Sequence, residues 1–228
     1  VDEFQLKARV SGVPGIKRES IFHALNQKAV ARRYAKSIGK KYEELNLIVV
    51  HLGGGISVGA HRKGLVIDVN NALNGEGPIS PERAGTVPSE ALATLCFSGK
   101  YTLNEVKKML HGKAGLAAYL GTSDMITIEE KAIEGKEPYK TLVAAMDYTV
   151  AKEIGAMFVA LKGQCDAIIL TGGIAYSDYC VADIKEQIEY LCKVVVLPGE
   201  NEMESLAENA FGALTGELPV LTYTGVSC

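Results

Sequence analysis

Apolar residues occur in two kinds of pattern along this chain. In the first, short apolar runs are bounded by glycine, proline or polar residues, which predicts buried strands at 47–50, 56–60, 64–69, 166–170 and 193–197. The first two runs are close enough to pair as a hairpin. The last two are separated by a helical pattern at 178–191, which is typical of a βαβ unit with parallel strands. This alternation predicts an α/β fold.

The second pattern is the three-and-four spacing of helices. It predicts a long helix at 139–161, whose apolar stripe belongs to the core or to a subunit interface. An earlier helix is expected to start at Ser20, which can cap it, and to end before Gly39. A capping box formed by Thr102 and Glu105 opens another helix. Further helices are predicted at 89–97, 103–111, 127–135 and 202–214, with a turn-rich joint at 116–125.

Composition narrows the class of protein. The 228 residues are 47% hydrophobic, enough for a substantial core, and the net charge is −3 without a pronounced basic cluster. These values argue against nucleic acid as a main partner, and no apolar run approaches the roughly 20 residues of a membrane span. The five cysteines are odd in number and lack a CxxC pair, which fits reduced thiols. We therefore expect a cytoplasmic protein that binds neither nucleic acid nor membranes.

The first residues predict that the chain is a fragment. It opens on Val1 rather than methionine, in what resembles the end of an apolar strand. Asp2 would then stand at a strand end, where open α/β folds place their ligands. It is a candidate base or metal anchor, although a solvated terminal aspartate is the commoner outcome.

Three consecutive glycines form the turn between the first two predicted strands. Glycine lets the backbone approach an anion closely and point its N–H groups at it, so Gly53, Gly54 and Gly55 are candidates for holding a phosphate. The alternative is a tight hairpin whose glycines serve geometry alone. His51, a titratable side chain where the strand meets the glycines, favours the phosphate interpretation.

A long polar loop at 70–85 contains a second candidate. Arg83 lies in it between Pro81 and Gly85, and an arginine held in such a frame suits bidentate capture of a phosphate or a carboxylate. Long irregular loops in compact domains are usually functional or disordered. A plain surface arginine is the alternative. His23, in the first turn of the helix that begins near Ser20, is interpreted from its context as a structural histidine bonded to a backbone carbonyl.

Two further features lie in the last third of the chain. Gly172, Gly173 and Ile174 make a glycine turn at the carboxyl end of a predicted strand, where nucleotides commonly bind. The spacing GxGxxG and the P-loop motif are both absent. The acidic cluster of Glu200, Glu202 and Glu204 either complements the dipole of the last helix or lends one carboxylate to a phosphate-bound Mg²⁺. Together these features predict a phosphate-handling cleft.

Several long motifs of the chain resemble butyrate kinases. They are FHALNQKAVARR (22–33), HLGGGISVGAH (51–61), VIDVNNALNGEGPISPERAG (66–85), ILTGGIAYS (169–177) and PGENEMESLAENA (198–210). The chain is more loosely similar to acetate kinases, whose equivalents read FHGTSH and HLGNGAS. The resemblance covers essentially the whole chain. It implies an RNase H-like domain of the type found in actin and acetate kinase, with a mixed sheet flanked by helices.

The resemblance also implies roles for the candidates. His51 and the glycines after it match a phosphate motif whose histidine contacts the transferring phosphoryl group, and His23 matches a second histidine near that group. Arg83 matches an arginine that neutralises the same charge. Asp2 and Glu202 match two acids linked to the metal and the reacting oxygens, with Glu204 as an alternative to Glu202. Gly172, Gly173 and Ile174 match the adenosine motif.

The implied reaction is the reversible transfer of phosphate from ATP to butyrate or a related short-chain fatty acid, which gives butanoyl phosphate and ADP with Mg²⁺ as cofactor. A homodimer is expected. Residues 1–18 would be the remnant of an N-terminal domain, 19–203 the nucleotide-binding domain, and 204–228 a closing helix and tail. With roughly a third of such a kinase missing, the chain alone is expected to be inactive. The alternatives are a non-catalytic nucleotide-binding or dimerisation module, and an acetate or propionate kinase.

Overall fold

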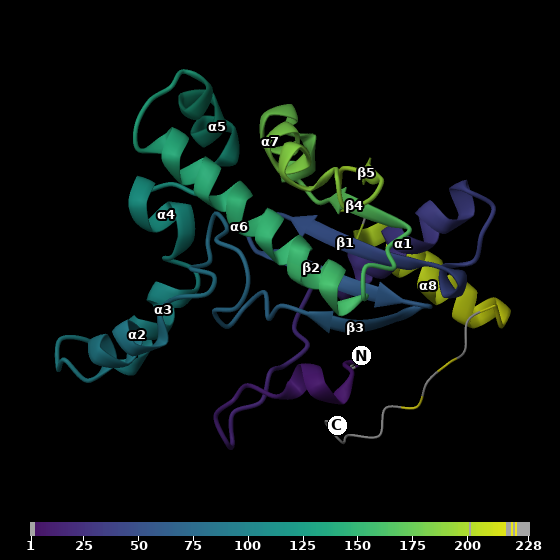
Figure 1. Cartoon of the computed structure of the whole chain (residues 1–228), viewed down its shortest axis with the longest axis horizontal. Coiled ribbons are helices and arrows are strands. Elements are labelled where there is room, and N and C mark those ends of the chain that lie inside the picture. The colour runs from purple at the N-terminus through teal and green to yellow at the C-terminus, as the bar shows by residue number, and fades with distance from the viewer. Residues whose placement is uncertain (1–2, 201, 218–219, 221, 223–228) are drawn as a thin grey trace.

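The computed structural model describes residues 3–200, 202–217, 220 and 222 (Figure 1). They form a five-stranded sheet in the order β3-β2-β1-β4-β5. Its strands are β1 (Asn46–Leu52), β2 (Ile56–Arg62), β3 (Leu65–Val69), β4 (Ala167–Thr171) and β5 (Val194–Val196). β1 is antiparallel to β2 and parallel to β4, and β5 is parallel to β4. The predicted hairpin, the βαβ unit and the mixed sheet are all confirmed.

Helices cover both faces of this sheet. The short helices between β3 and α6 are α2 (Ser89–Cys96), α3 (Leu103–Leu110), α4 (Gly115–Leu120) and α5 (Met125–Ile133). The longer ones that flank the sheet are α1 (Ala24–Ser37), α6 (Tyr139–Ala160), α7 (Asp178–Ile188) and α8 (Glu202–Thr215). In Figure 1, α6 crosses one face of the sheet and α1 lies on the other, with α8 beside it.

Alternation along β1 divides the core into two layers. Ile48 and Val50 pack in one cluster with the buried residues of α6 and α7, whereas Leu47 and Val49 pack in a second cluster with α1. All of β1 is buried, because successive side chains of a strand point to opposite faces and both faces are covered. The apolar stripe predicted for α6 lies in the first cluster, so it belongs to the core.

Three boundaries differ from the sequence predictions. α1 begins at Ala24 with His23 in the capping position, so Ser20 is not its cap. Residues 115–120 form α4, where a turn-rich joint was expected. α5 begins at Met125, and its cap is the Asp124 side chain, which accepts a hydrogen bond from the Ile126 backbone N–H. At α5 the side chains of Asp124 and Thr127 can both cap a helix, and at α4 a glycine stands next to a short apolar run, so the local pattern was ambiguous at both places.

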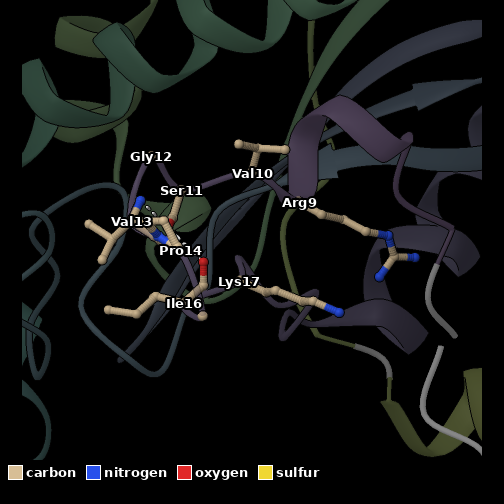
Figure 2. Close-up of a pocket in the computed structure, with 9 residues that line it drawn as sticks. Arg9, Val10, Ser11, Gly12, Val13, Pro14, Ile16 and Lys17 are labelled. Atoms are coloured by element: carbon tan, nitrogen blue, oxygen red, sulfur yellow. Dashed lines mark hydrogen bonds between the residues drawn. The ribbon is translucent and has the colours of Figure 1, made fainter.

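The first described residues pack on the edge strand. Phe4 and Ala8 are buried against Val66 and Val69 of β3. The hairpin at 9–17 that follows encloses a small pocket of about 370 Å³, which contains none of the predicted site residues (Figure 2). The Ser11 hydroxyl closes this hairpin by donating to the Ile16 carbonyl at 2.6 Å. The division of the chain at residues 18 and 203 stays a prediction.

Two expectations from composition concern cysteines and membranes. Cys96, Cys165, Cys180 and Cys192 are free thiols. Within the described part of the chain, no helix combines the length and the apolar character that crossing a bilayer would require.

One buried carboxyl group in α6 makes folding stability depend on pH. Asp147 is fully buried, and no N–H or O–H group among the described residues donates to its carboxyl oxygens; the weakly polar Cys180 thiol lies beside it. Burial, reinforced by the negative charge of Asp183, raises its pKa from 3.8 to about 8. Asp147 therefore stays protonated in the folded protein at pH values where the unfolded chain has lost this proton.

We expect Asp147→Asn to stabilise the protein more at pH 8 than at pH 5. The folded state binds the extra proton between about pH 4 and pH 8, so the contribution of Asp147 to stability falls as pH rises through that range. The difference between the two pH values should be on the order of 2 to 4 kcal/mol in free energy of unfolding, measured by urea titration. An equal effect at both pH values would contradict this pKa.

Candidate phosphate-binding site

Two histidines stack at the carboxyl end of the central strand. His51 is the penultimate residue of β1, and His23 immediately precedes α1. Their ring centroids lie 3.7 Å apart with an interplanar angle of 12°. The sequence separates these residues by 28 positions, and packing α1 on the face of β1 brings them together. The prediction that both act at one place is therefore compatible with the fold.

Each ring is held by a buried polar neighbour. His51 Nδ1 lies 2.9 Å from Asn26 Oδ1, and His23 Nδ1 lies 2.8 Å from Ser57 Oγ. Asn26 is in the first turn of α1, and Ser57 is in β2. The partner of His23 is thus a side-chain hydroxyl, and the expected bond to a backbone carbonyl is wrong.

Both histidines are neutral at physiological pH. Burial, together with the positive charge of Arg83, lowers the pKa of His23 to about 4. Burial, together with His23, lowers the pKa of His51 to about 3. The contact of 3.6 Å between His51 Nε2 and Glu200 Oε1 is therefore not an ion pair in the free protein at neutral pH. It becomes one only if His51 gains a proton.

The three glycines lie beside these rings. A Cβ atom added at Gly53 would stand 3.0 Å from His51 Nε2 and 3.4 Å from Glu200 Oε1. One added at Gly55 would stand 3.8 Å from the His23 ring and 3.9 Å from Arg83 Cγ. The glycine turn, both histidines and Arg83 therefore surround one small volume. A side chain at either glycine would take up part of it, which gives these glycines a reason beyond turn geometry.

The turn that carries Arg83 is fastened to the glycine turn. The Ser80 hydroxyl donates to the Gly54 carbonyl at 2.7 Å and accepts from the Arg83 N–H at 3.1 Å. The Glu82 N–H donates to the same Gly54 carbonyl at 3.1 Å. A Cβ atom at Gly115 would stand only 1.9 Å from the Ser80 carbonyl, so α4 can support this turn only with glycine there.

The guanidinium of Arg83 has unused hydrogen-bonding capacity. Its Nε is buried and has no hydrogen-bond partner among the described residues. Its NH1 donates to the Glu82 carbonyl at 3.3 Å and lies 3.8 Å from a carboxylate oxygen of Glu82, beyond hydrogen-bond distance. A buried cationic donor without a partner is costly in a protein, and an anion beside His23 would satisfy it. A plain surface arginine would be solvated, and this one is only 24% exposed.

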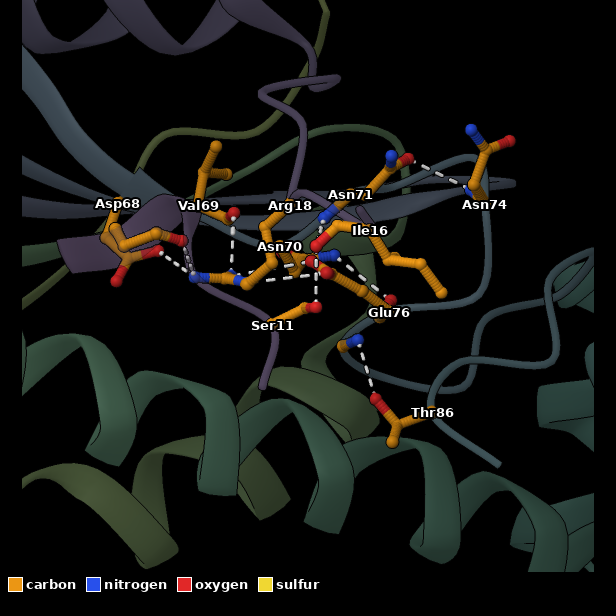
Figure 3. A network of polar contacts seen from close by, with 12 residues as sticks. Ser11, Ile16, Arg18, Asp68, Val69, Asn70, Asn71, Asn74, Glu76 and Thr86 are labelled. Carbon is orange, nitrogen blue, oxygen red and sulfur yellow. Dashed lines mark hydrogen bonds and ion pairs between the residues drawn. The ribbon is translucent and has the colours of Figure 1, made fainter. Parts of the chain in front are cut away.

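The long loop before Arg83 is held by an ion-pair network (Figure 3). Arg18 lies between the carboxylates of Asp68 and Glu76, at 3.0 and 3.2 Å. Glu76 also accepts from the Asn71 N–H at 2.9 Å, while the Asn70 side chain pairs with the backbone of β2 at Val58 and Ile56. This network explains why a loop so rich in glycine and proline is ordered.

The second glycine turn closes the opposite side of the end of β1. Gly172 has φ +91°, and a Cβ atom there would stand 2.4 Å from the Leu52 carbonyl oxygen. Its backbone pairs with Gly199 in both directions, at 3.2 and 3.0 Å. The Asn26 side chain donates to the Glu200 carbonyl at 2.7 Å, which links this segment to His51. The second glycine turn is thus adjacent to the first.

A polar pocket of about 610 Å³ adjoins the turn that carries Arg83. It is lined by residues of α4 and of the segments on either side of it, among them Lys113, Thr122 and Ser123. The Ser123 hydroxyl donates to a carboxylate oxygen of Glu82 at 3.2 Å. The volume lies within the usual range for sites that hold small molecules.

The structure brings together His23, His51, the first glycine turn, Arg83 and the second glycine turn. Asp2 lies outside the described residues, and so do the side chains of Glu202 and Glu204. Their predicted roles stay predictions. Among the described residues, no three His, Cys, Asp or Glu side chains gather as a metal site would require.

Sequence reasoning did not select three residues that the structure places at the site: Asn26, Ser57 and Ser80. Each acts through a contact with a distant segment, such as that of Asn26 with His51 and Glu200. The only available signal was the position of Asn26, three residues after His23, which places it one helical turn along the same face.

Three histidines with lowered pKa values should make the protein sensitive to acid. Burial lowers the pKa of His61 to about 3, as it lowers those of His23 and His51. Because the unfolded chain takes up these protons near pH 6.5, stability is full above that pH and falls as pH drops toward 4. In the unmodified protein Asp147 opposes this trend, because its contribution to stability rises as pH falls. We therefore expect the urea midpoint of the Asp147→Asn variant to decrease steadily from pH 7 to pH 4.5. A flat profile would contradict the three lowered pKa values.

Comparisons with known proteins place the chain in a family. The model of the acetokinase family matches residues 3–211. Two curated relatives are probable butyrate kinases, one from Phocaeicola vulgatus at 71% identity and one from Bacteroides thetaiotaomicron at 55%. Each alignment covers 98% of this chain and 63% of the relative, so the chain spans less than two thirds of their length.

Solved structures give the same fold at low sequence identity. The acetate kinase of Porphyromonas gingivalis superposes with a TM-score of 0.80 at 21% identity, over 91% of this chain and 60% of that one. A propionate kinase from Francisella tularensis superposes with a TM-score of 0.78 at 20% identity, over 89% and 59%. These likenesses confirm the predicted RNase H-like fold of the acetate kinase type. The chain belongs to the acetokinase family.

Proposed function

We propose that the complete protein is a butyrate kinase, which transfers phosphate reversibly from ATP to butyrate or a related short-chain fatty acid. The observation that carries the proposal is the position of Arg83. Its partly buried guanidinium has an unpaired Nε and lies next to His23, His51 and a glycine turn. Such a cluster fits a dianionic phosphoryl group, and the relatives named as probable butyrate kinases support the choice of acceptor.

The proposed chemistry is a direct in-line transfer. A carboxylate oxygen of butyrate forms a bond to the γ-phosphorus of ATP as the bond to the β,γ-bridging oxygen breaks, and ADP leaves with that electron pair. Arg83 lies where charge on the transferring group would be neutralised, and the N–H groups of Gly53, Gly54 and Gly55 can approach the phosphate closely. Gly172, Gly173 and Ile174 are the proposed contacts for adenosine.

Mg²⁺ is the proposed cofactor, and the acids of the site are compatible with it. Mg²⁺ usually keeps several waters and takes one or two protein carboxylates besides the phosphates. Glu200 offers a carboxylate that is 53% exposed beside Gly53. Glu202, with Glu204 as its alternative, and Asp2 remain proposed metal-linked acids. When bound, the ion would neutralise phosphate charge.

Further parts of the proposal concern the surroundings of the enzyme. We propose a homodimer that acts in the cytoplasm and uses neither nucleic acid nor membrane as a partner. Acetate and propionate are the nearest alternative substrates, since the superposed solved structures include an acetate kinase and a propionate kinase. A non-catalytic nucleotide-binding module is the remaining alternative, although nothing in the site favours it.

The test is an acyl-phosphate assay on the product of the complete gene, with its intact mass measured on the same sample. ATP, Mg²⁺ and each of butyrate, isobutyrate, propionate and acetate are supplied in turn. We expect turnover with the highest kcat/KM for butyrate, and formation of ATP from butanoyl phosphate and ADP in reverse. Binding of ADP with Mg²⁺ but no turnover with any acid would replace the kinase with a nucleotide-binding module.

A further inference from the structure

A buried chain of hydrogen bonds runs from the interior of the sheet to the histidine pair. We call it the relay; it consists of Tyr42, His61, Gln27, Ser57 and His23. Tyr42 Oη lies 2.7 Å from His61 Nδ1, and His61 Nε2 lies 2.9 Å from Gln27 Oε1. Gln27 Nε2 lies 2.8 Å from Ser57 Oγ, which in turn lies 2.8 Å from His23 Nδ1. Apart from His23, all of its members are buried.

The Gln27 amide fixes the direction of these bonds. Its nitrogen also lies 3.1 Å from the backbone carbonyl oxygen of Ser57. A carbonyl oxygen only accepts, so the amide group that faces it must be the NH₂ and the amide oxygen must face His61. His61 then donates through Nε2–H. Because His61 is neutral, its Nδ1 accepts from the Tyr42 hydroxyl.

The same amide decides the proton position at the other end of the relay. Gln27 uses its second N–H to donate to Ser57 Oγ. Ser57 is fully buried, and its hydroxyl hydrogen has no acceptor among the described residues other than His23 Nδ1. If His23 donated instead, that hydrogen would be buried without a partner. His23 Nδ1 therefore accepts, and the ring carries its proton on Nε2.

His51 has the opposite arrangement. The Asn26 amide nitrogen donates to the Glu200 carbonyl at 2.7 Å, so Asn26 Oδ1 faces His51 Nδ1 at 2.9 Å and must accept from it. The neutral His51 ring then has a bare lone pair on Nε2, the atom nearest Gly53 and Glu200. The two stacked rings thus differ in which nitrogen holds the proton.

We propose that Ser57 and Gln27 are positioning residues that fix His23 as an uncharged Nε2–H donor for the phosphoryl group. This proposal rests on the proposed kinase function. An uncharged donor suits this location, because a second cation next to Arg83 would be repelled, whereas a neutral N–H can still stabilise a phosphoryl oxygen. The donor exists only if the tautomer is fixed, and the relay fixes it.

The tautomers can be measured without any assay of activity. Long-range ¹H–¹⁵N correlation spectra of the chain labelled with ¹⁵N-histidine at pH 7 distinguish a protonated from a bare ring nitrogen. We expect His23 and His61 to carry the proton on Nε2 and His51 to carry it on Nδ1. The signals are assigned with single histidine-to-glutamine variants. A His23 spectrum with the proton on Nδ1 would overturn the proposal in the unmodified chain.

Ser57→Ala should release the tautomer of His23 without changing that of His51. The His23 spectrum of this variant should shift toward a mixture of the Nδ1–H and Nε2–H tautomers, because no group donates to His23 Nδ1 any longer. Gln27→Met should have the same effect and serves if Ser57→Ala folds poorly. Thr102→Ala is the control, since it removes a hydroxyl from the capping box of α3. A His23 spectrum that stays unchanged in both relay variants would contradict the role of the relay.

Activity of the complete protein then separates this proposal from the function on which it rests. Ser57→Ala should lower kcat for acyl-phosphate formation about 10- to 100-fold and change KM for ATP less than about 2-fold. The loss in kcat should be smaller than that from removing a donor that contacts the transition state directly. Equal kcat in Ser57→Ala and the unmodified enzyme would refute the positioning role and leave the kinase intact. Correct tautomers without turnover in the unmodified enzyme would refute the kinase and leave the tautomers established.

Discussion

Replacing Arg83 with alanine in the complete protein is expected to lower kcat by at least about 10³-fold, with a much smaller change in KM for ATP. An arginine that meets the transferring phosphoryl group is worth about 10³ to 10⁵ in rate. Arg83 has the geometry for this role, since its buried Nε lacks a partner among the described residues and its side chain lies beside His23 and Gly55. The charge that it would neutralise develops during transfer, so binding of ATP should depend on it little.

The measurement is steady-state kinetics of acyl-phosphate formation with three variants. Arg83→Lys keeps the charge but loses the planar fork, so it should recover part of the rate. Arg33→Ala removes an exposed arginine of α1 and serves as the control for charge. If Arg83→Ala lowered nucleotide affinity and kcat by the same factor, Arg83 would stabilise the bound ground state as well and would not act specifically on the transition state.

Arg83 is expected to supply the positive charge of the site, because the neighbouring histidines are uncharged at neutral pH. His23 and His51 are both neutral at pH 7, because burial lowers their pKa values to about 4 and about 3. Arg83 is then the permanent positive charge at the centre of the described site. In the proposed mechanism, His23 donates a hydrogen bond of fixed direction to the phosphoryl group, and Arg83 supplies the positive charge. This division predicts a larger loss from Arg83→Ala than from His51→Ala.

The fold followed closely from local sequence patterns. The strands came from apolar runs bounded by turn residues, and the hairpin came from the glycines between two of them. His51 and the glycine turn were recognisable because they are adjacent in sequence. The long resemblance to butyrate kinases then added His23, whose local context indicated only a structural histidine.

The contacts that orient the site could not be predicted in the same way. Asn26 meets Glu200, a residue 174 positions away, and Ser57 meets His23 across α1 and β2. Periodicity assigns such residues to a face of an element, but it does not give their partners. The start of α1 was misplaced for a related reason, since Ser20 has the chemistry of a cap while the chain turns into the helix only at His23.

Gly172→Ala is expected to destabilise the protein by roughly 3 kcal/mol or more, whereas Gly173→Ala should change its stability by less than about 0.5 kcal/mol. The two glycines are adjacent but differ in geometry. At Gly172 the backbone has φ +91°, and an added Cβ atom would stand 2.4 Å from the Leu52 carbonyl oxygen. At Gly173 the φ value is −67°, and a Cβ atom would have no heavy atom within 4 Å.

Comparing the Gly172→Ala and Gly173→Ala variants distinguishes a structural role of the second glycine turn from a role in nucleotide binding. Leu52 immediately precedes Gly53, so the displacement that Gly172→Ala requires would also move the first glycine turn. Gly173→Ala leaves the fold intact but adds a methyl group where the nucleotide is proposed to approach. Urea unfolding gives the stabilities, and kinetics of the complete protein should show a raised KM for ATP in Gly173→Ala. A stable Gly173→Ala variant with an unchanged KM would mean that the nucleotide does not approach the backbone at that position.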